Sequence, residues 1–155
     1  MDYVSRMLVC DYISGATGSF STPFGAHTGI GTLPIVLYGS EKQLKDYVPK
    51  LASGEWFASY CLTEPGAGSD ANSGKTKAVL SDDGTHYKIS GQKIWISNAG
   101  FAKLFIVFAR IEDDKNITSF LVPYDPDNGI TLGEEEKKLG INSSSTRQVF
   151  FNETK

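Results

Sequence analysis

The spacing of apolar residues changes from helical to strand-like near Gly54, and this change limits the folds open to the chain. Before it, Val4, Met7, Leu8 and Tyr12 recur at steps of three and four residues, which predicts an amphipathic or buried helix. After it, short runs rich in aromatic and β-branched side chains are typical of strands. Because the helices precede the strands and do not alternate with them, the sequence favours an α+β fold.

The first part of the chain carries signals for several helix boundaries. Residues 15–31 are rich in small side chains and are expected to form a loop before a closely packed helix that ends at Gly39. Ser40 begins the next helix, because Gln43 stands three residues later as in a capping box. Pro49 lies inside that helical pattern and lacks a backbone N–H, so we expect the helix to break there.

The second part contains seven runs with the composition of strands. They lie at 56–63, 76–81, 86–91, 92–97, 104–111, 117–124 and 147–151. Turn signals separate several of them, notably Ser81–His86 and Tyr124–Gly129. The expected architecture is a short helical segment, residues 1–54, followed by an antiparallel β-barrel or sandwich, residues 55–155.

Composition excludes several classes of protein. The chain has 155 residues, 40% hydrophobic and 12% aromatic, which is enough apolar surface for the core of about one domain. The net charge of −3 and the absence of a basic cluster argue against a nucleic-acid partner. No apolar stretch is long enough to span a membrane.

Cysteine and histidine usage indicates neither disulfides nor a metal. Cys10 and Cys61 have no metal-ligand spacing and are expected to be reduced, buried thiols in a cytosolic type of compartment. The first residues also lack the pattern of a secretory signal. His27 and His86 are far apart in the sequence, so no metal site is expected; His27 is interpreted as packed or capping, and His86 as exposed.

The stretch YCLTEPGAGSD is an unusually bare turn between hydroxyl residues. Gly66 and Gly68 have no Cβ, so a flat ligand can lie against their peptide planes, and exposed N–H groups there can bind an anion. Thr63 and Ser69 can donate hydrogen bonds to phosphate or carbonyl oxygens. The spacing is not G-x-G-x-x-G, which disfavours a Rossmann or P-loop site. From these residues alone, a plain turn and a ligand-binding loop both remain open.

The stretch QKIWISNAG places a tryptophan among polar residues of a predicted strand. Alternation puts Ile94 and Ile96 on one face. Lys93, Trp95 and Ser97 are then expected on the other face. The indole offers a broad apolar plane for an aromatic ring, but it could equally pack under a neighbouring helix.

Together these motifs resemble the acyl-CoA dehydrogenase family. YCLTEPGAGSD is followed about thirty residues later by WISNAG, the stretch GAHTGIGTLPIVLYGSEKQLKDYVPKLASGE precedes them, and SSSTRQVFF follows. The resemblance implies that residues 1–54 are the end of an N-terminal helical domain and residues 55–155 a middle β domain. Since the chain begins within a helical pattern and ends without a closing element, we expect a fragment of a longer protein.

The resemblance also implies a cofactor, FAD, held by two segments. The first contains Tyr60, Cys61, Leu62, Thr63, Gly66, Gly68 and Ser69, and the second contains Trp95, Ile96 and Ser97. Thr63 and the backbone of Leu62 would contact the flavin ring. Ser69 would lie near the FAD pyrophosphate and the acyl-CoA substrate. Trp95 would pack beside the isoalloxazine, and the Ser97 hydroxyl, where many relatives have threonine, would lie near N5.

What the resemblance implies for function is oxidation of the α,β bond of a fatty acyl-CoA, with hydride transfer to flavin N5. The catalytic glutamate would lie beyond Lys155, so this chain alone is expected to be inactive. An electron-transferring flavoprotein is the implied electron acceptor, and the full-length protein is expected to be a homo-oligomer in the cytoplasm, or in the mitochondrial matrix of a eukaryote. The alternatives are an acyl-CoA oxidase and a non-catalytic β-sandwich binding module.

Several charged residues have simpler interpretations. Glu64 and Asp70 flank the bare turn and are expected to accept backbone N–H bonds there, with no role as the base. The charged run Glu134–Lys138 is expected to be solvated. Arg147 could reach a phosphate but is interpreted as a charge at a strand edge.

Overall fold

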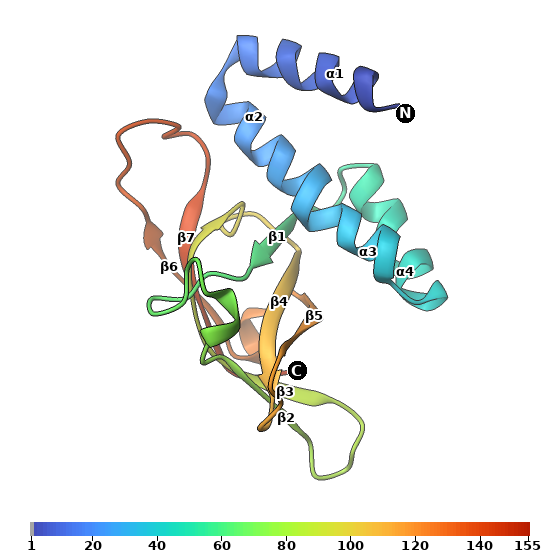
Figure 1. Ribbon diagram of the computed structural model, residues 1–155, viewed down its shortest axis with the longest axis vertical. Coiled ribbons are helices and arrows are strands. Elements are labelled where there is room, and N and C mark those ends of the chain that lie inside the picture. Colours follow the sequence, from blue (N-terminus) through green and yellow to red (C-terminus); the bar gives the residue numbers. More distant parts are fainter. Residues whose placement is uncertain (1) are drawn as a thin grey trace.

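The structure, a computed structural model, describes residues 2–155 and has a helical layer above a single sheet (Figure 1). The helices are α1 (Tyr3–Ala16), α2 (Gly18–Gly25), α3 (Leu33–Tyr38) and α4 (Glu41–Ala52), with a π-helix, η1 (Ala26–Thr32), between α2 and α3 and short 3₁₀ turns η2 (Ala71–Ser73) and η3 (Pro126–Asn128). The strands are β1 (Ala58–Cys61), β2 (Lys77–Leu80), β3 (Tyr87–Ser97), β4 (Leu104–Ile111), β5 (Ile117–Pro123), β6 (Ile130–Glu135) and β7 (Thr146–Thr154). The α+β order is therefore confirmed.

The loop expected at residues 15–31 is wrong, because α2, η1 and α3 run on as one helical rod (Figure 1). The small residues that suggested a loop allow close packing against the sheet. A Cβ added to Gly31 would lie 2.8 Å from the Cβ of Ala58 in β1, so this contact needs a glycine. His27, 7% exposed, reinforces it, since its Nδ1 accepts from the Ala58 N–H at 3.2 Å and its Nε2 donates to the Leu51 carbonyl at 3.0 Å.

The helix break expected at Pro49 is also wrong. Helix α4 begins with the predicted capping box of Ser40 and Gln43 and continues through Pro49 to Ala52. Proline inside a helix costs about 3 kcal/mol or more. Leu51, which is 1% exposed, packs in the core shared with the sheet and anchors the last turn of this helix.

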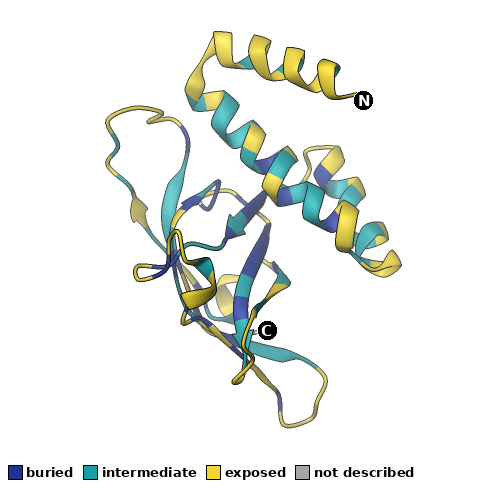
Figure 2. Ribbon diagram, in the orientation of Figure 1, coloured by how far each residue is buried: buried dark blue, intermediate teal, exposed yellow. Residues whose placement is uncertain are grey.

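Helix α1 lies apart from the sheet and is exposed along most of its length (Figure 2). The apolar side chains that predicted it, Val4, Met7, Leu8 and Tyr12, are all exposed. Cys10 is exposed on the same helix, so the expectation of two buried thiols holds only for Cys61; both cysteines are free.

The sheet has seven strands in the order β1-β4-β2-β3-β7-β6, with β5 also paired to β4. The predicted antiparallel arrangement holds for most pairs, but β1 and β2 each pair with β4 in parallel. Along residues 2–155 the strand pairings do not close into a barrel. Two predicted strands are the two halves of β3, and β6 was missed because its Gly133 and two glutamates weaken the strand pattern.

Strands β1 and β2 lie end to end along one edge of β4, and this explains the position of the bare turn. Cys61 pairs with Val107, and Lys77 pairs with Arg110. Residues 62–76 therefore leave the sheet between two nearby positions of β4. We call residues 62–76 the excursion. Beyond its pairing with β2, strand β3 continues past the two ends of the excursion and then lies along β1.

Two cores form because β4 alternates its side chains between the two faces of the sheet. Leu104 and Ile106 face the helices and pack with Ile35 and Leu51. Phe105 and Val107 face the other way, into a cluster supplied by β3, β5, β6 and β7. The dark, buried segments in Figure 2 accordingly gather on the central strands and along the rod that crosses them.

Candidate functional site

The two predicted cofactor segments meet where the excursion leaves β1. The Ile94 N–H donates to the Thr63 carbonyl at 2.9 Å, and the Ser59 hydroxyl donates to the Ser97 carbonyl at 2.8 Å. Strand β3 is thereby held beside the last residues of β1 and the first residues of the loop. Thr63 is thus brought close to the segment that carries Trp95 and Ser97, although about thirty residues of sequence separate them.

A buried ion pair closes the base of the excursion. Lys93 Nζ lies 2.7 Å from Glu64 Oε1 and also donates to the Leu62 carbonyl at 3.1 Å. The Glu64 carboxylate accepts the Lys75 N–H at 2.5 Å and the Thr76 N–H at 3.1 Å. The Glu64 carboxylate, near the start of residues 62–76, thus binds both the end of this segment and Lys93 of β3. The expectation that Glu64 accepts backbone N–H bonds is confirmed.

Burial and hydrogen bonding oppose each other at this pair. Burial by itself raises the pKa of Glu64, but the hydrogen bonds from Lys93, Thr76 and Lys75 outweigh it and hold this pKa below the usual value. Burial lowers the pKa of Lys93, and the bond to Glu64 offsets part of that shift. A carboxylate that three donors hold in its charged form, with its pKa lowered, is unsuitable as a catalytic base.

Trp95 stands at a β-bulge that turns its indole outward. Lys93 pairs with Val149 and Ile96 pairs with Arg147, so β3 has one more residue than β7 between these pairs. Trp95 has φ of 57°, a left-handed value that costs about 1–3 kcal/mol for a residue with a Cβ. Its side chain is 64% exposed, whereas Lys93 is 1% exposed. The sequence predicted Lys93 and Trp95 on the same face of the strand. This prediction is wrong, because the extra residue of the bulge places Trp95 on the exposed side while Lys93 is buried.

Hydrogen-bonding groups remain available around this bulge. Within residues 2–155, the hydroxyls of Thr63, Ser69 and Ser97 take part in no hydrogen bond, and neither do the main-chain N–H groups of Gly66 and Gly68. The three hydroxyl residues are half-buried or exposed. The exposed indole and the hydroxyls of Thr63 and Ser97, on two segments joined by a backbone hydrogen bond, fit a flat heterocycle with carbonyl oxygens. Ser69 and the free N–H groups of Gly66 and Gly68, further along residues 62–76, fit phosphate oxygens.

Three of the predicted contact residues point elsewhere. Cys61 is 0% exposed and Ile96 is 2% exposed, and both lie in the core, where burial strongly raises the pKa of the thiol. The Tyr60 ring packs against Phe108 at 4.9 Å between centroids, on the face of the sheet toward the helices. Only the main chain of Cys61 and Ile96 could reach a ligand at the bulge. Leu62 is half-buried and contributes its carbonyl to Lys93.

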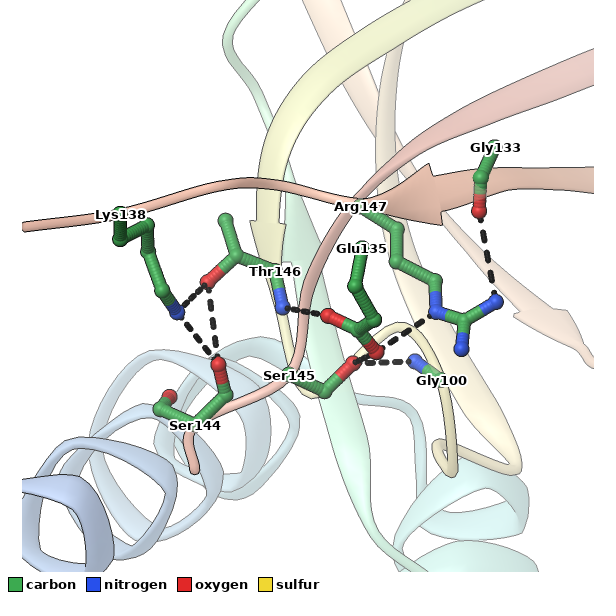
Figure 3. Close-up of polar contacts among 8 residues, drawn as sticks. All are labelled: Gly100, Gly133, Glu135, Lys138, Ser144, Ser145, Thr146 and Arg147. Carbon is green, nitrogen blue, oxygen red and sulfur yellow. Dashed lines mark hydrogen bonds and ion pairs between the residues drawn. The ribbon is translucent and has the colours of Figure 1, made fainter. Parts of the chain in front are cut away.

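A second polar cluster holds the turn after Ser97, and sequence reasoning missed it. Figure 3 shows the Glu135 carboxylate accepting from the Ser145 hydroxyl at 2.7 Å, from the Thr146 N–H at 2.8 Å and from Arg147 Nε at 2.7 Å. The Ser145 hydroxyl in turn accepts the Gly100 N–H at 3.0 Å. Burial raises the pKa of Glu135, but these hydrogen bonds outweigh it and lower the pKa overall.

The charged run 134–138 is consequently not simply solvated. Lys138 donates to the Ser144 carbonyl and, at 2.7 Å, to the Thr146 hydroxyl (Figure 3). Arg147 is a charge at a strand edge, as expected, with Glu135 as its partner. The run of three serines and a threonine at residues 143–146 was the only sequence signal that polar side chains gather here.

Asn98 is another residue that the sequence did not single out. It is 0% exposed, with φ of 67°, and its amide donates to the Pro23 carbonyl at 3.1 Å and the Ala58 carbonyl at 3.3 Å. Its N–H donates to the Ser145 carbonyl at 3.0 Å. Asparagine tolerates the left-handed conformation, so it can end the second segment while bonding to both the helical rod and β1.

The remaining polar residues have structural positions. Asp70 makes no side-chain cap; its main-chain oxygen accepts from the Ser73 N–H at 3.1 Å and the Ser73 hydroxyl at 2.7 Å, so the expected carboxylate bonds are wrong. His27 is packed, as expected, whereas His86 is half-buried and not fully exposed. Among residues 2–155, no cluster of potential metal ligands occurs, and no helix has the length and apolar character needed to cross a membrane.

Comparison with known families assigns both parts of the chain. Residues 1–55 match the family described as "Acyl-CoA dehydrogenase, N-terminal domain". Residues 59–154 match the family described as "Acyl-CoA dehydrogenase, middle domain".

Individual relatives agree with this assignment. The chain is 50% identical over 153 residues to a "Probable acyl-CoA dehydrogenase" of Bacillus subtilis, with 99% of this chain and 25% of the relative covered. It is 48% identical over 135 residues to human "Very long-chain specific acyl-CoA dehydrogenase, mitochondrial", with 82% of this chain and 20% of the relative covered. A crystal structure of an acyl-CoA dehydrogenase complexed with FAD from Bacillus anthracis superposes with a TM-score of 0.93 at 48% identity, with 99% of this chain and 26% of that chain covered. The chain thus spans about a quarter of the length of these relatives.

Proposed function

We propose that this chain, which belongs to the acyl-CoA dehydrogenase family, supplies the flavin-ring side of the FAD site in an FAD-dependent acyl-CoA dehydrogenase. The observation that carries the proposal is the hydrogen bond of 2.9 Å between the Ile94 N–H and the Thr63 carbonyl. It joins the bare turn to the bulge that exposes Trp95. The two motifs that resemble the family in sequence therefore share one edge of the fold.

Each residue of the proposed site has a physical role. The Trp95 indole offers its face to the flavin ring, and the bulge keeps it out of the core. The free hydroxyls of Thr63 and Ser97 donate to the ring edge, where fixed donors act more strongly in a dry site than in water. Ser69 and the free N–H groups of Gly66 and Gly68 receive phosphate oxygens, and Ser69 also borders the acyl-CoA substrate.

FAD held by these residues would supply the redox chemistry, as the hydride acceptor for oxidation of the α,β bond of a fatty acyl-CoA, with the α proton going to a base. The residues of this chain orient the cofactor and exclude water around it. The base is a glutamate beyond Lys155. Glu64 does not serve as that base, because Lys93 and two backbone N–H groups occupy its carboxylate.

The proposal extends to domains and partners. Residues 1–54 form the end of an N-terminal helical domain and residues 55–155 a middle β domain, although α4 and β4 share one core. The electron acceptor is an electron-transferring flavoprotein, and the full-length protein is a homo-oligomer. Its compartment is the cytoplasm, or the mitochondrial matrix in a eukaryote, which a bacterial relative and a mitochondrial relative support. An oxidase is not favoured, because these relatives are named as dehydrogenases.

The test is the variant Trp95→Ala in the full-length protein. We expect the Kd for FAD to rise by about tenfold, corresponding to about 1.4 kcal/mol of lost binding free energy, and the ratio of FAD to protein after gel filtration to fall as a result. Stability should change little, since the indole is 64% exposed.

Tyr38→Ala is a matched control, because Tyr38 is an aromatic residue, 86% exposed, on helix α3. This variant should retain FAD like the parent. Equal FAD content in Trp95→Ala and the parent would contradict the role of Trp95, and a parent without FAD would favour the non-catalytic binding module.

A further inference from the structure

The Lys93–Glu64 pair lies between the two segments of the candidate site, and both of its side chains are almost fully buried. Lys93 is 1% exposed and Glu64 is 7% exposed. Neither residue was a candidate for cofactor contact. Two opposite charges have been removed from water together, and this carries a penalty of several kcal/mol per ion that only good geometry offsets.

The pair joins three stretches of backbone that are distant in sequence. Lys93 binds the Leu62 carbonyl, where the chain leaves β1. Glu64 binds the N–H groups of Lys75 and Thr76, where the chain returns to β2. The backbone hydrogen bonds of 3.1 Å between Glu64 and Ala67, one in each direction, tighten the start of the loop further. The loop between these points is therefore closed at its base by side chains of one ion pair.

The same lysine is the first residue of the bulge that presents Trp95. Lys93 pairs with Val149, and the extra residue of β3 follows directly. Its ammonium is fixed to the loop, while its backbone is fixed to β7. The relative position of Thr63 and Trp95 then depends on this side chain and on the backbone bond from Ile94 to Thr63.

Stability alone gives little reason for an ion pair at this position. Well-packed apolar residues of similar volume commonly replace a buried pair with equal or greater stability. An ion pair that also makes hydrogen bonds to three separate backbone groups, here the Leu62 carbonyl and the Lys75 and Thr76 N–H groups, does, however, select one geometry. We infer that Lys93 and Glu64 are positioning residues that lock the two flavin-contacting segments into register, an inference that rests on the proposed function.

The test is the double variant Glu64→Gln with Lys93→Met in the full-length protein, which removes both charges and keeps the side-chain volumes. The matched control is Asp46→Asn with Lys42→Met, which makes the same chemical changes at an exposed pair on α4. Three quantities are compared: the free energy of unfolding in urea, the Kd for FAD, and the exchange rate of the Ile94 amide without FAD.

We expect the double variant to remain close to the parent in stability, because no buried charge is left unpaired. Its Kd for FAD should rise by about tenfold, which corresponds to one lost hydrogen bond. The Ile94 amide should exchange faster, and the control should match the parent in all three quantities. The single variant Glu64→Asp keeps the charge but shortens the reach to Lys75 and Thr76, and it should raise the Kd even if the double variant unfolds.

An unchanged Kd and unchanged Ile94 exchange in both variants would overturn the inference and leave the pair a purely structural one. If the parent retained no FAD, the proposed function would fail, and with it the flavin role of the pair. Faster Ile94 exchange in the variants would then show only that the pair holds the loop to β3. The two failures are therefore distinguishable.

Discussion

Two carboxylates, Glu64 and Glu135, anchor the two predicted cofactor segments in different surroundings. Each accepts two or more hydrogen bonds and pairs with a cation, Glu64 with Lys93 and Glu135 with Arg147, at 2.7 Å in both cases. The side chains of the first pair are 2% and 7% exposed, whereas those of the second are 31% and 46% exposed. The contact distance is equal, but the access of water is not.

The difference in water access between the two ion pairs indicates which of them controls the geometry of the candidate site. At the exposed pair, water solvates either partner when the contact opens, so its contribution is small. At the buried pair, no solvent replaces a lost partner, so opening it leaves a charge unpaired. We therefore expect the backbone of the first segment to keep one conformation. The turn after the second segment should change conformation at a smaller cost in free energy.

The largest expected effect is that of Lys93→Met alone. It leaves the Glu64 carboxylate buried without its cation, which should lower the free energy of unfolding by about 3–5 kcal/mol. Urea denaturation followed by tryptophan fluorescence measures it. A loss no larger than that of an exposed pair would show that water reaches Glu64, and the contrast between the two carboxylates would disappear.

The next effect is on the pH dependence of stability. The folded pKa of Glu64 lies below 4.5, the value in a model peptide, so its stabilisation is complete above pH 4.5 and is lost as the pH falls toward the folded pKa. Glu64→Gln should therefore flatten the acid side of the stability curve. Urea midpoints measured between pH 3 and 6 test this, and Glu135→Gln should flatten the same curve less. Equal flattening would contradict the difference in burial.

A smaller effect is expected for Glu135→Gln at neutral pH. Because the Glu135 side chain is 46% exposed, the variant should cost no more than about 1 kcal/mol. Amide exchange should become faster at Gly100, whose N–H bonds to the Ser145 hydroxyl that Glu135 orients. A loss like that of Lys93→Met would show that this cluster also locks the site.

The smallest effect is expected for Lys42→Met on helix α4. Its ion pair with Asp46 has side chains that are 85% and 43% exposed, so stability should not change measurably by urea denaturation. This variant sets the baseline against which the buried and half-exposed pairs are compared. A measurable loss would mean that exposure is a poor guide to the strength of ion pairs in this chain.

The sequence determined the order of the elements and the two motifs of the site. Apolar periodicity and turn residues act over a few neighbours, so they correctly indicated α1, the capping box at Ser40 and most strands. The bare turn and the tryptophan among polar residues were likewise visible as local composition. These features depend on short-range sterics and hydrogen bonding, which a stretch of sequence carries with it.

Only the tertiary structure decided how these pieces meet. The rod through residues 18–38 and the helix through Pro49 persist because packing on the sheet outweighs poor local propensity. The bulge at Trp95, and the burial of Lys93 beside Glu64, depend on the pairing of β3 with β7 and on the chain leaving β1 at residue 62. Such contacts join residues that are distant in the sequence, such as Lys93 with Glu64 and with Val149, and the burial that makes them strong is a property of the whole fold.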